Sequence, residues 1–209
     1  MRRSLMLCAA WVLSMSACST AESPKPPARE PQQAASTALG VLQQFVTASN
    51  YQAMGFASAG EVKGAQLGSP LNLYNIGLDA LRSYETSTDV NKLLVLSNES
   101  VYPVTVGGEV KSSVSIVKLE NGYQVSSFGN AKAIASLARF RQAAPSDEFI
   151  VRVPALNIQF LGRRLEGRVL LVPTMEDSRL KVAVGEAVPL DVVLGQLVPL
   201  AKAYNGLPM

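Results

Sequence analysis

The stretch of residues 101–129 constrains the fold most, because two strong turn signals separate three runs of strand-forming residues. Asn121-Gly122 suits a two-residue type I′ turn, which needs positive φ at both of its positions. Gly107-Gly108 marks the second turn. The stretch therefore predicts three consecutive antiparallel strands, a β-meander that forms the core sheet.

The same turns predict which residues pair. The Asn-Gly turn would pair Lys118 with Val125 and Ile116 with Ser127. At the other turn we favour a three-residue loop, 107–109, over a two-residue loop, because it gathers the apolar side chains of the first two strands on one face. The residues on that face would be Tyr102, Val104, Val106, Val110, Ser112 and Val114.

The segments around the meander predict an α+β fold, with helices packed on a curved antiparallel sheet. Helices are expected over residues 37–49, 131–142 and 189–204, and strands over 71–76, 92–97, 149–153, 156–161, 168–172 and 180–184. Residues 37–143 would form an α+β domain. Residues 148–209 would form a second β-rich half with a C-terminal helix, either separate or part of the same domain. A helix on a curved sheet resembles cystatin-like and NTF2-like domains, by architecture alone.

Residues 1–17 read as an export signal. Arg2 and Arg3 supply the positive start, and residues 5–15 form an apolar run too short to span a membrane. The run ends in Met15-Ser16-Ala17-Cys18, which resembles the lipobox of bacterial lipoproteins, with Met in place of the usual Leu. The alternative is an ordinary secretory signal that is cut after Ala17.

The lipoprotein resemblance implies cleavage before Cys18, a thioether-linked lipid on its sulfur and acylation of the new amino terminus. Several acyl chains anchor a protein firmly, so the membrane would be a partner through Cys18. Ser19 follows the cysteine, which by the sorting rule of such proteins implies the outer membrane, facing the periplasm. Residues 18–36 are rich in proline and poor in large apolar residues, which predicts an extended tether.

Composition excludes several kinds of chemistry. The chain contains no histidine, and its two cysteines, Cys8 and Cys18, lie in or at the end of the signal. Catalysis by Ser-His-Asp or Cys-His groups and the usual zinc sites are therefore excluded, and no cofactor is expected. Loss of Arg2 and Arg3 with the signal leaves 17 basic and 16 acidic residues. That balance argues against nucleic acid as a partner.

A few short motifs could carry chemistry. Ser178 and Lys181 match the Ser-x-x-Lys of penicillin-binding enzymes, although no Lys-Thr-Gly accompanies them. The acidic pairs 147–148 and 176–177 fit solvated turns better than glycoside chemistry. Arg163, Arg164 and Arg168 could meet lipid head groups or an anionic cell-wall polymer, or simply end a polar hairpin.

The leading hypothesis is a membrane-anchored envelope lipoprotein without enzymatic activity, which binds another envelope protein as an accessory or assembly factor. The predicted partner surface is the charge-poor sheet around Ser113 and Ser115. The first alternative is a carrier of apolar ligand or lipid, because Val117, Leu119 and Phe128 make the second face of the meander apolar as well. The second alternative is an enzyme that uses carboxylates alone.

Overall fold

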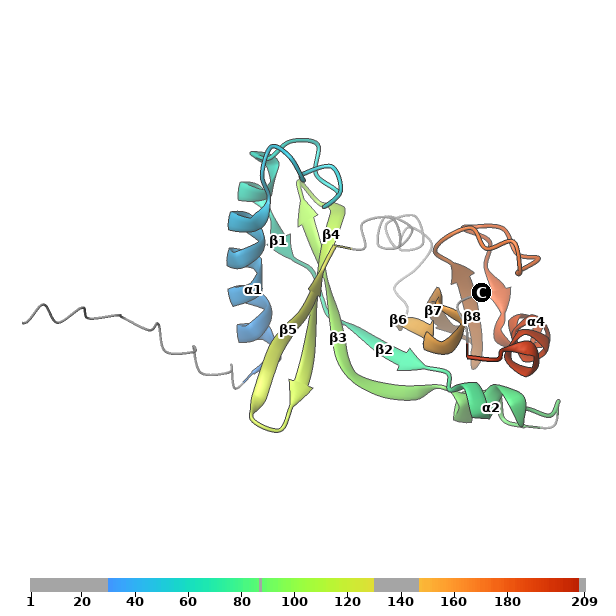
Figure 1. Ribbon diagram of the computed structural model, residues 1–209. Helices are drawn as coiled ribbons and strands as arrows, with labels where there is room; N and C mark the ends of the chain where they lie inside the picture. The colour runs from blue at the N-terminus through green and yellow to red at the C-terminus, as the bar shows by residue number, and fades with distance from the viewer. Residues whose placement is uncertain (1–29, 87, 130–146, 207–209) are drawn as a thin grey trace, which may run out of the picture.

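The computed structural model describes residues 30–86, 88–129 and 147–206, and these form an α+β fold around one nine-stranded sheet (Figure 1). The strands are β1 Gln66–Leu67, β2 Leu71–Asn75, β3 Val95–Val106, β4 Glu109–Leu119, β5 Gly122–Phe128, β6 Glu148–Val153, β7 Ile158–Leu165, β8 Arg168–Pro173 and β9 Val188–Pro189. The α-helices in the described part are α1 Pro31–Phe45, α2 Leu78–Arg82 and α4 Leu190–Ala203. Short 3₁₀ turns are η1 Glu61–Gly64, η2 Val90–Leu93 and η3 Pro154–Leu156.

The sheet joins both halves of the chain through a single parallel pair. Its strand order is β5-β4-β3-β2-β6-β7-β8-β9, with β1 beside β3. β2 and β6 run parallel, with Asn72 opposite Phe149, and every other strand pair is antiparallel. The predicted antiparallel sheet is therefore wrong at this one pair. The β-rich half that starts at residue 148 continues the same sheet (Figure 1).

Three clusters of buried side chains hold the layers together. α1 packs on β4 and β5 through Ala35, Ala38 and Leu42, which meet Val104 and Ile116 of the meander. At the other end, α4 and α2 cover β8 and the strands beside it. A third cluster lies where the halves meet, on β2, β3, β6, β7 and β8, and consists of Leu71, Leu73, Val101, Ile150, Leu161 and Val172.

The first helix begins six residues earlier than the sequence indicates. We expected a tether up to residue 36, but α1 starts at Pro31 and already buries Ala34 and Ala35. Proline suits the first helical turn, where its missing N–H has no helical partner to lose. Small alanines let the helix lie close to the sheet, so this part of the tether belongs to the fold.

The meander forms as predicted, but the first turn has a different register. Val106 pairs with Glu109 across a two-residue Gly107-Gly108 loop, where a three-residue loop was expected. A bulge then shifts the ladder, so that Thr105 pairs with Val110 and Val104 with Ser112. The bulge places Tyr102, Val104 and Val114 on the α1 side and Val110 against the central cluster.

The Asn-Gly turn is also shifted by one residue. Glu120 and Asn121 form the turn, and Gly122 opens β5 with φ of 133°. Lys118 consequently pairs with Tyr123, and Ile116 with Val125, which contradicts the predicted pairs Lys118–Val125 and Ile116–Ser127. A second bulge inserts Ser126 between Val125 and Ser127, so the strand keeps its apolar residues on the α1 side.

The remaining predicted elements agree only in part with the structure. Five elements lie close to their expected positions, namely β2, β6, β7, β8 and α4. Residues 92–97 are not one buried strand, because Leu93 and Leu94 end a 3₁₀ turn and Val95 and Leu96 are exposed. Residues 180–184 form turns and no strand. The helix expected over 131–142 lies outside the described residues, and no helix among the described ones is long and apolar enough to cross a membrane.

Candidate binding surface

The two residues predicted to form the partner surface are buried. Ser113 and Ser115 are each only 3% exposed. Ser113 donates its hydroxyl hydrogen to the carbonyl of Gly129, and Ser115 lies opposite the buried Val101. The two serine side chains of β4 therefore lie in the interior and do not face solvent. Cys18, the predicted lipidation site, lies outside the described residues.

The three arginines of the β7–β8 hairpin do not form one basic patch. Arg163 is buried, whereas Arg168 is exposed beyond the turn. The Arg164 guanidinium lies over the rings of Phe149 and Tyr74, at 4.7 Å and 5.3 Å from their centroids. A guanidinium in this position is attracted to the negative faces of the rings. Arg164 therefore packs at the β2–β6 joint.

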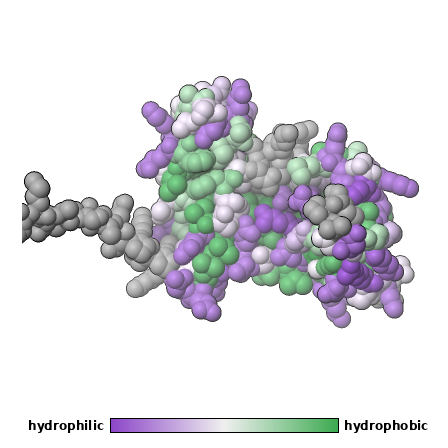
Figure 2. Space-filling model, in the orientation of Figure 1, coloured by the Kyte–Doolittle hydropathy of each residue, from purple (hydrophilic) through white to green (hydrophobic). Residues whose placement is uncertain are grey.

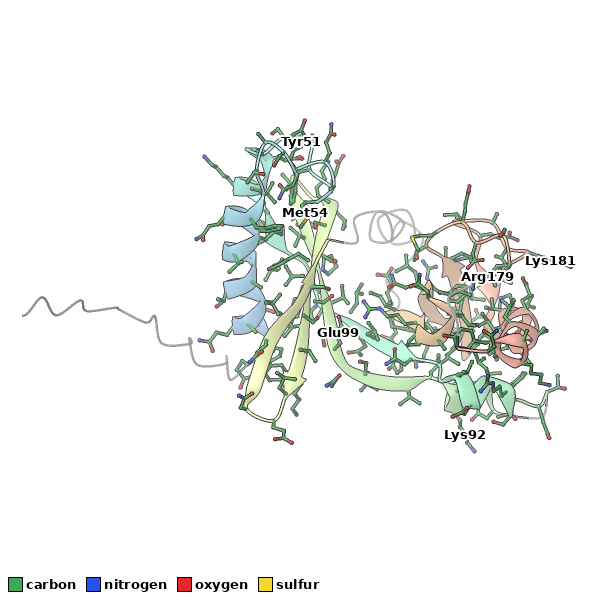
Figure 3. The ribbon with its side chains drawn as sticks, viewed as in Figure 1. Tyr51, Met54, Lys92, Glu99, Arg179 and Lys181 are labelled. Atoms are coloured by element: carbon green, nitrogen blue, oxygen red, sulfur yellow. The ribbon has the colours of Figure 1, made fainter. Side chains whose placement is uncertain are left out.

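Ser178 lies in a turn and opens neither a helix nor the predicted strand. The next residue, Arg179, donates hydrogen bonds to both Asp177 oxygens, at 2.8 Å and 2.5 Å, and to the Leu156 carbonyl at 2.9 Å. Hydrogen bonds from Arg179 lower the pKa of the Asp177 carboxyl. These contacts fix the loop to η3, while the Lys181 side chain points outward (Figure 3).

A polar network links the meander to the second half of the sheet. Glu99 of β3 accepts a hydrogen bond from Ser126 of β5 at 3.0 Å and pairs with Arg152 of β6 at 2.9 Å. Arg152 also donates from Nε to Gln159 of β7 at 3.1 Å. Glu99 thus lies between the two halves (Figure 3) and ties four strands together.

An irregularity in β3 positions Glu99. Asn72 pairs with Ser100 but Tyr74 pairs with Leu96, so three residues of β3 lie opposite Leu73 alone. Such a bulge bends the strand and re-aims its side chains. Beside the network is a pocket of about 240 Å³, whose lining includes Arg152, Gln159, Thr174 and Met175. Its walls offer hydrogen bonds but neither a thiol nor an imidazole.

β5 forms one edge of the sheet and pairs only with β4 among the described strands. Its seven residues, Gly-Tyr-Gln-Val-Ser-Ser-Phe, contain no charge and no proline, and residues 124–127 are exposed. Proteins usually protect an open edge with lysine, proline, a bulge or a covering segment. The bulge at Ser126 is the one such feature within this strand. Within the described part of the chain, no strand pairs with the outer side of β5.

Apolar side chains are exposed on β5 and on the two elements that contact it, β4 and α1. Val125 of β5 and Leu119 of β4 are each 42% exposed. On α1, Val41 and Phe45 lie one helical turn apart and are also exposed. Figure 2 shows hydrophobic side chains over α1 and the neighbouring β5. An uncharged edge with apolar flanks has the composition of a protein-binding surface.

No family model, curated protein or solved structure matches this chain. The low charge of residues 101–129 is evident from the sequence, but the residues predicted for the surface lie on the central strand, whose serines are buried. The alternation of polar and apolar residues in β5 could have indicated an exposed edge. Nothing in the sequence pointed to the contact between Glu99 and Arg152, which lie in distant segments.

Proposed function

We propose that this protein is a lipid-anchored lipoprotein of the bacterial envelope that binds another protein chain and carries out no catalysis of its own. The observation that carries the proposal is the exposed, uncharged and proline-free edge of β5. An extended chain that pairs with such an edge gains main-chain hydrogen bonds, and side chains beside it add selectivity. The proposed location is the outer membrane, facing the periplasm, where Cys18 would hold the domain.

The core arrangement supports binding at a surface over transport in a cavity. Of the apolar residues that motivated a lipid carrier, Phe128 packs with the α1 cluster, whereas Leu119 is exposed on the surface. The proposed likeness to cystatin-like and NTF2-like domains contributes nothing to the choice of partner. A carboxylate-only enzyme stays an alternative prediction.

The anchor is tested by replacing Cys18 with alanine. The variant should be exported yet fail to be lipidated, because the cysteine sulfur is the expected acylation site. We therefore expect it to leave the membrane fraction after a carbonate wash, whereas the wild type stays. Immunoblotting of washed membranes and of the soluble fraction measures this. Equal retention of both proteins would contradict the lipoprotein assignment.

The binding surface is tested by crosslinking in intact cells, followed by capture of this protein. Val125→Lys places a charge on the β5 edge, and we expect it to abolish recovery of the crosslinked chain. Leu96→Lys is the matched control, since Leu96 is an exposed apolar residue on β3, away from β5. Both changes should leave the melting temperature nearly unchanged, because exposed substitutions usually cost little. Equal recovery from both folded variants would place the interface elsewhere.

A further inference from the structure

The β5 edge has a sequence that can pair with itself. Along the β4 ladder the consecutive positions of β5 are Tyr123, Gln124, Val125, Ser127 and Phe128, because Ser126 is the bulged residue. If two β5 strands meet antiparallel about Val125, then Val125 lies opposite its own copy. Gln124 then faces Ser127, and Tyr123 faces Phe128, on both sides of the centre.

These pairs are favourable ones. The partners of Tyr123, Val125 and Phe128 on β4 are Lys118, Ile116 and Val114, and the last two point towards α1. The self-paired edge would therefore carry two Tyr–Phe pairs and one Val–Val pair on its α1 side. Aromatic and β-branched cross-strand pairs stabilise sheets, whereas like charges opposite each other destabilise them. β5 carries no charge that could repel its copy.

The position of α1 fits the same arrangement. Antiparallel pairing of two identical edges places a two-fold axis perpendicular to the sheet, so both copies of α1 lie on one face. α1 packs on β4 and β5, so each helix lies beside the joint. Both copies of α1 then begin on the same face of the joined sheet, which is compatible with tethering of both chains to one membrane.

From this symmetry we propose that the chain bound at β5 is a second copy of this protein, paired antiparallel about Val125. The proposal rests on the proposed function, because it names the occupant of the same edge. A homodimer would continue the nine described strands of each copy into one sheet across the two-fold axis. Binding of a different protein at this edge is an outcome that the test separates.

The test co-expresses two full-length copies that carry different epitope tags, extracts the membranes in mild detergent, and captures one tag while blotting for the other. The wild-type pair should be recovered together. Val125→Lys in both copies, or Val125→Glu in both, places like charges opposite each other and should reduce co-capture about tenfold or more. Mixing a Val125→Lys copy with a Val125→Glu copy should restore it, since the opposite charges then face each other.

Restoration by the mixed pair also shows that both variants fold, so loss in the like-charged pairs cannot come from misfolding. Absence of co-capture in the wild type would overturn the dimer. Co-capture that survives in both like-charged pairs would overturn it as well. If the crosslinked cells yield a different protein that depends on Val125 while the tagged copies are never recovered together, the dimer fails and the proposed binding function stands.

Discussion

Replacing Leu42 with alanine is expected to lower the free energy of unfolding by about 2–5 kcal/mol, the usual cost of truncating a buried leucine. Leu42 is fully buried between α1 and the meander and meets the same cluster as Val104 and Ile116. The change would remove both the apolar burial and the contacts that hold the helix on the sheet. Because proteins are stable by only about 5–15 kcal/mol, urea unfolding should show a much lower midpoint.

The neighbouring residue provides the control. Val41 lies on the same helix but is 46% exposed, so Val41→Ala should change the unfolding free energy by no more than about 0.5 kcal/mol. A similar small effect for Leu42→Ala would mean that α1 is not packed on the sheet as described. The pair of variants thus tests whether the segment that starts at Pro31 belongs to the folded domain.

Gly162→Ala is expected to destabilise the protein by about 1–3 kcal/mol through overpacking. Gly162 pairs with Phe149 across the β6–β7 ladder, and an added Cβ would lie only 2.3 Å from the Phe149 ring. The ring is buried, packs edge-on against Tyr74 at 5.2 Å and lies under the Arg164 guanidinium. Any shift of the ring therefore disturbs the joint between the two halves of the sheet.

Thermal and urea unfolding of Gly162→Ala should be compared with those of Gly195→Ala. Gly195 lies within α4, and nothing comes within 4 Å of the position its Cβ would occupy. Alanine is the better helix former, so that variant should be unchanged or more stable by up to about 1 kcal/mol. A Gly162→Ala protein as stable as the wild type would show that the Phe149 ring does not lie against this glycine.

Local patterns predicted the elements well and their pairing poorly. The meander, β6 to β8 and α4 follow from apolar periodicity and turn residues, which act over short stretches. At the first turn the loop has two residues instead of three, and the bulge at Lys111 then restores the pairing of Val104 with Ser112 that the predicted loop implies. At the second turn the register is wrong because the turn itself lies one residue earlier, at residues 120–121, than predicted. The three-residue loop was predicted because it gathers apolar side chains on one face. A bulge instead lets apolar side chains be buried on both faces of the sheet. The parallel pairing of β2 with β6 depends on residues far apart and has no local signal.

The candidate surface was predicted only in outline. Low charge drew attention to the meander, but Ser113 and Ser115 lie in the interior. Polarity alone does not distinguish a serine that faces solvent from one whose hydroxyl bonds to a nearby carbonyl, as that of Ser113 does. The exposed edge follows from strand order, and strand order depends on the whole chain. Lipidation at Cys18 stays a prediction from the sequence.

The parallel joint has a consequence for how the chain folds. The β3–β4–β5 meander and the β6–β7–β8 hairpins pair residues close together in sequence, so each can form early. The contact between β2 and β6 closes a loop from residue 72 to residue 149, and the entropy of that closure must be overcome before the contact is gained. We expect joining of the two halves to limit the folding rate. During synthesis β2, which pairs with β3 on one side, would then wait with its other edge unpaired until β6 has been made.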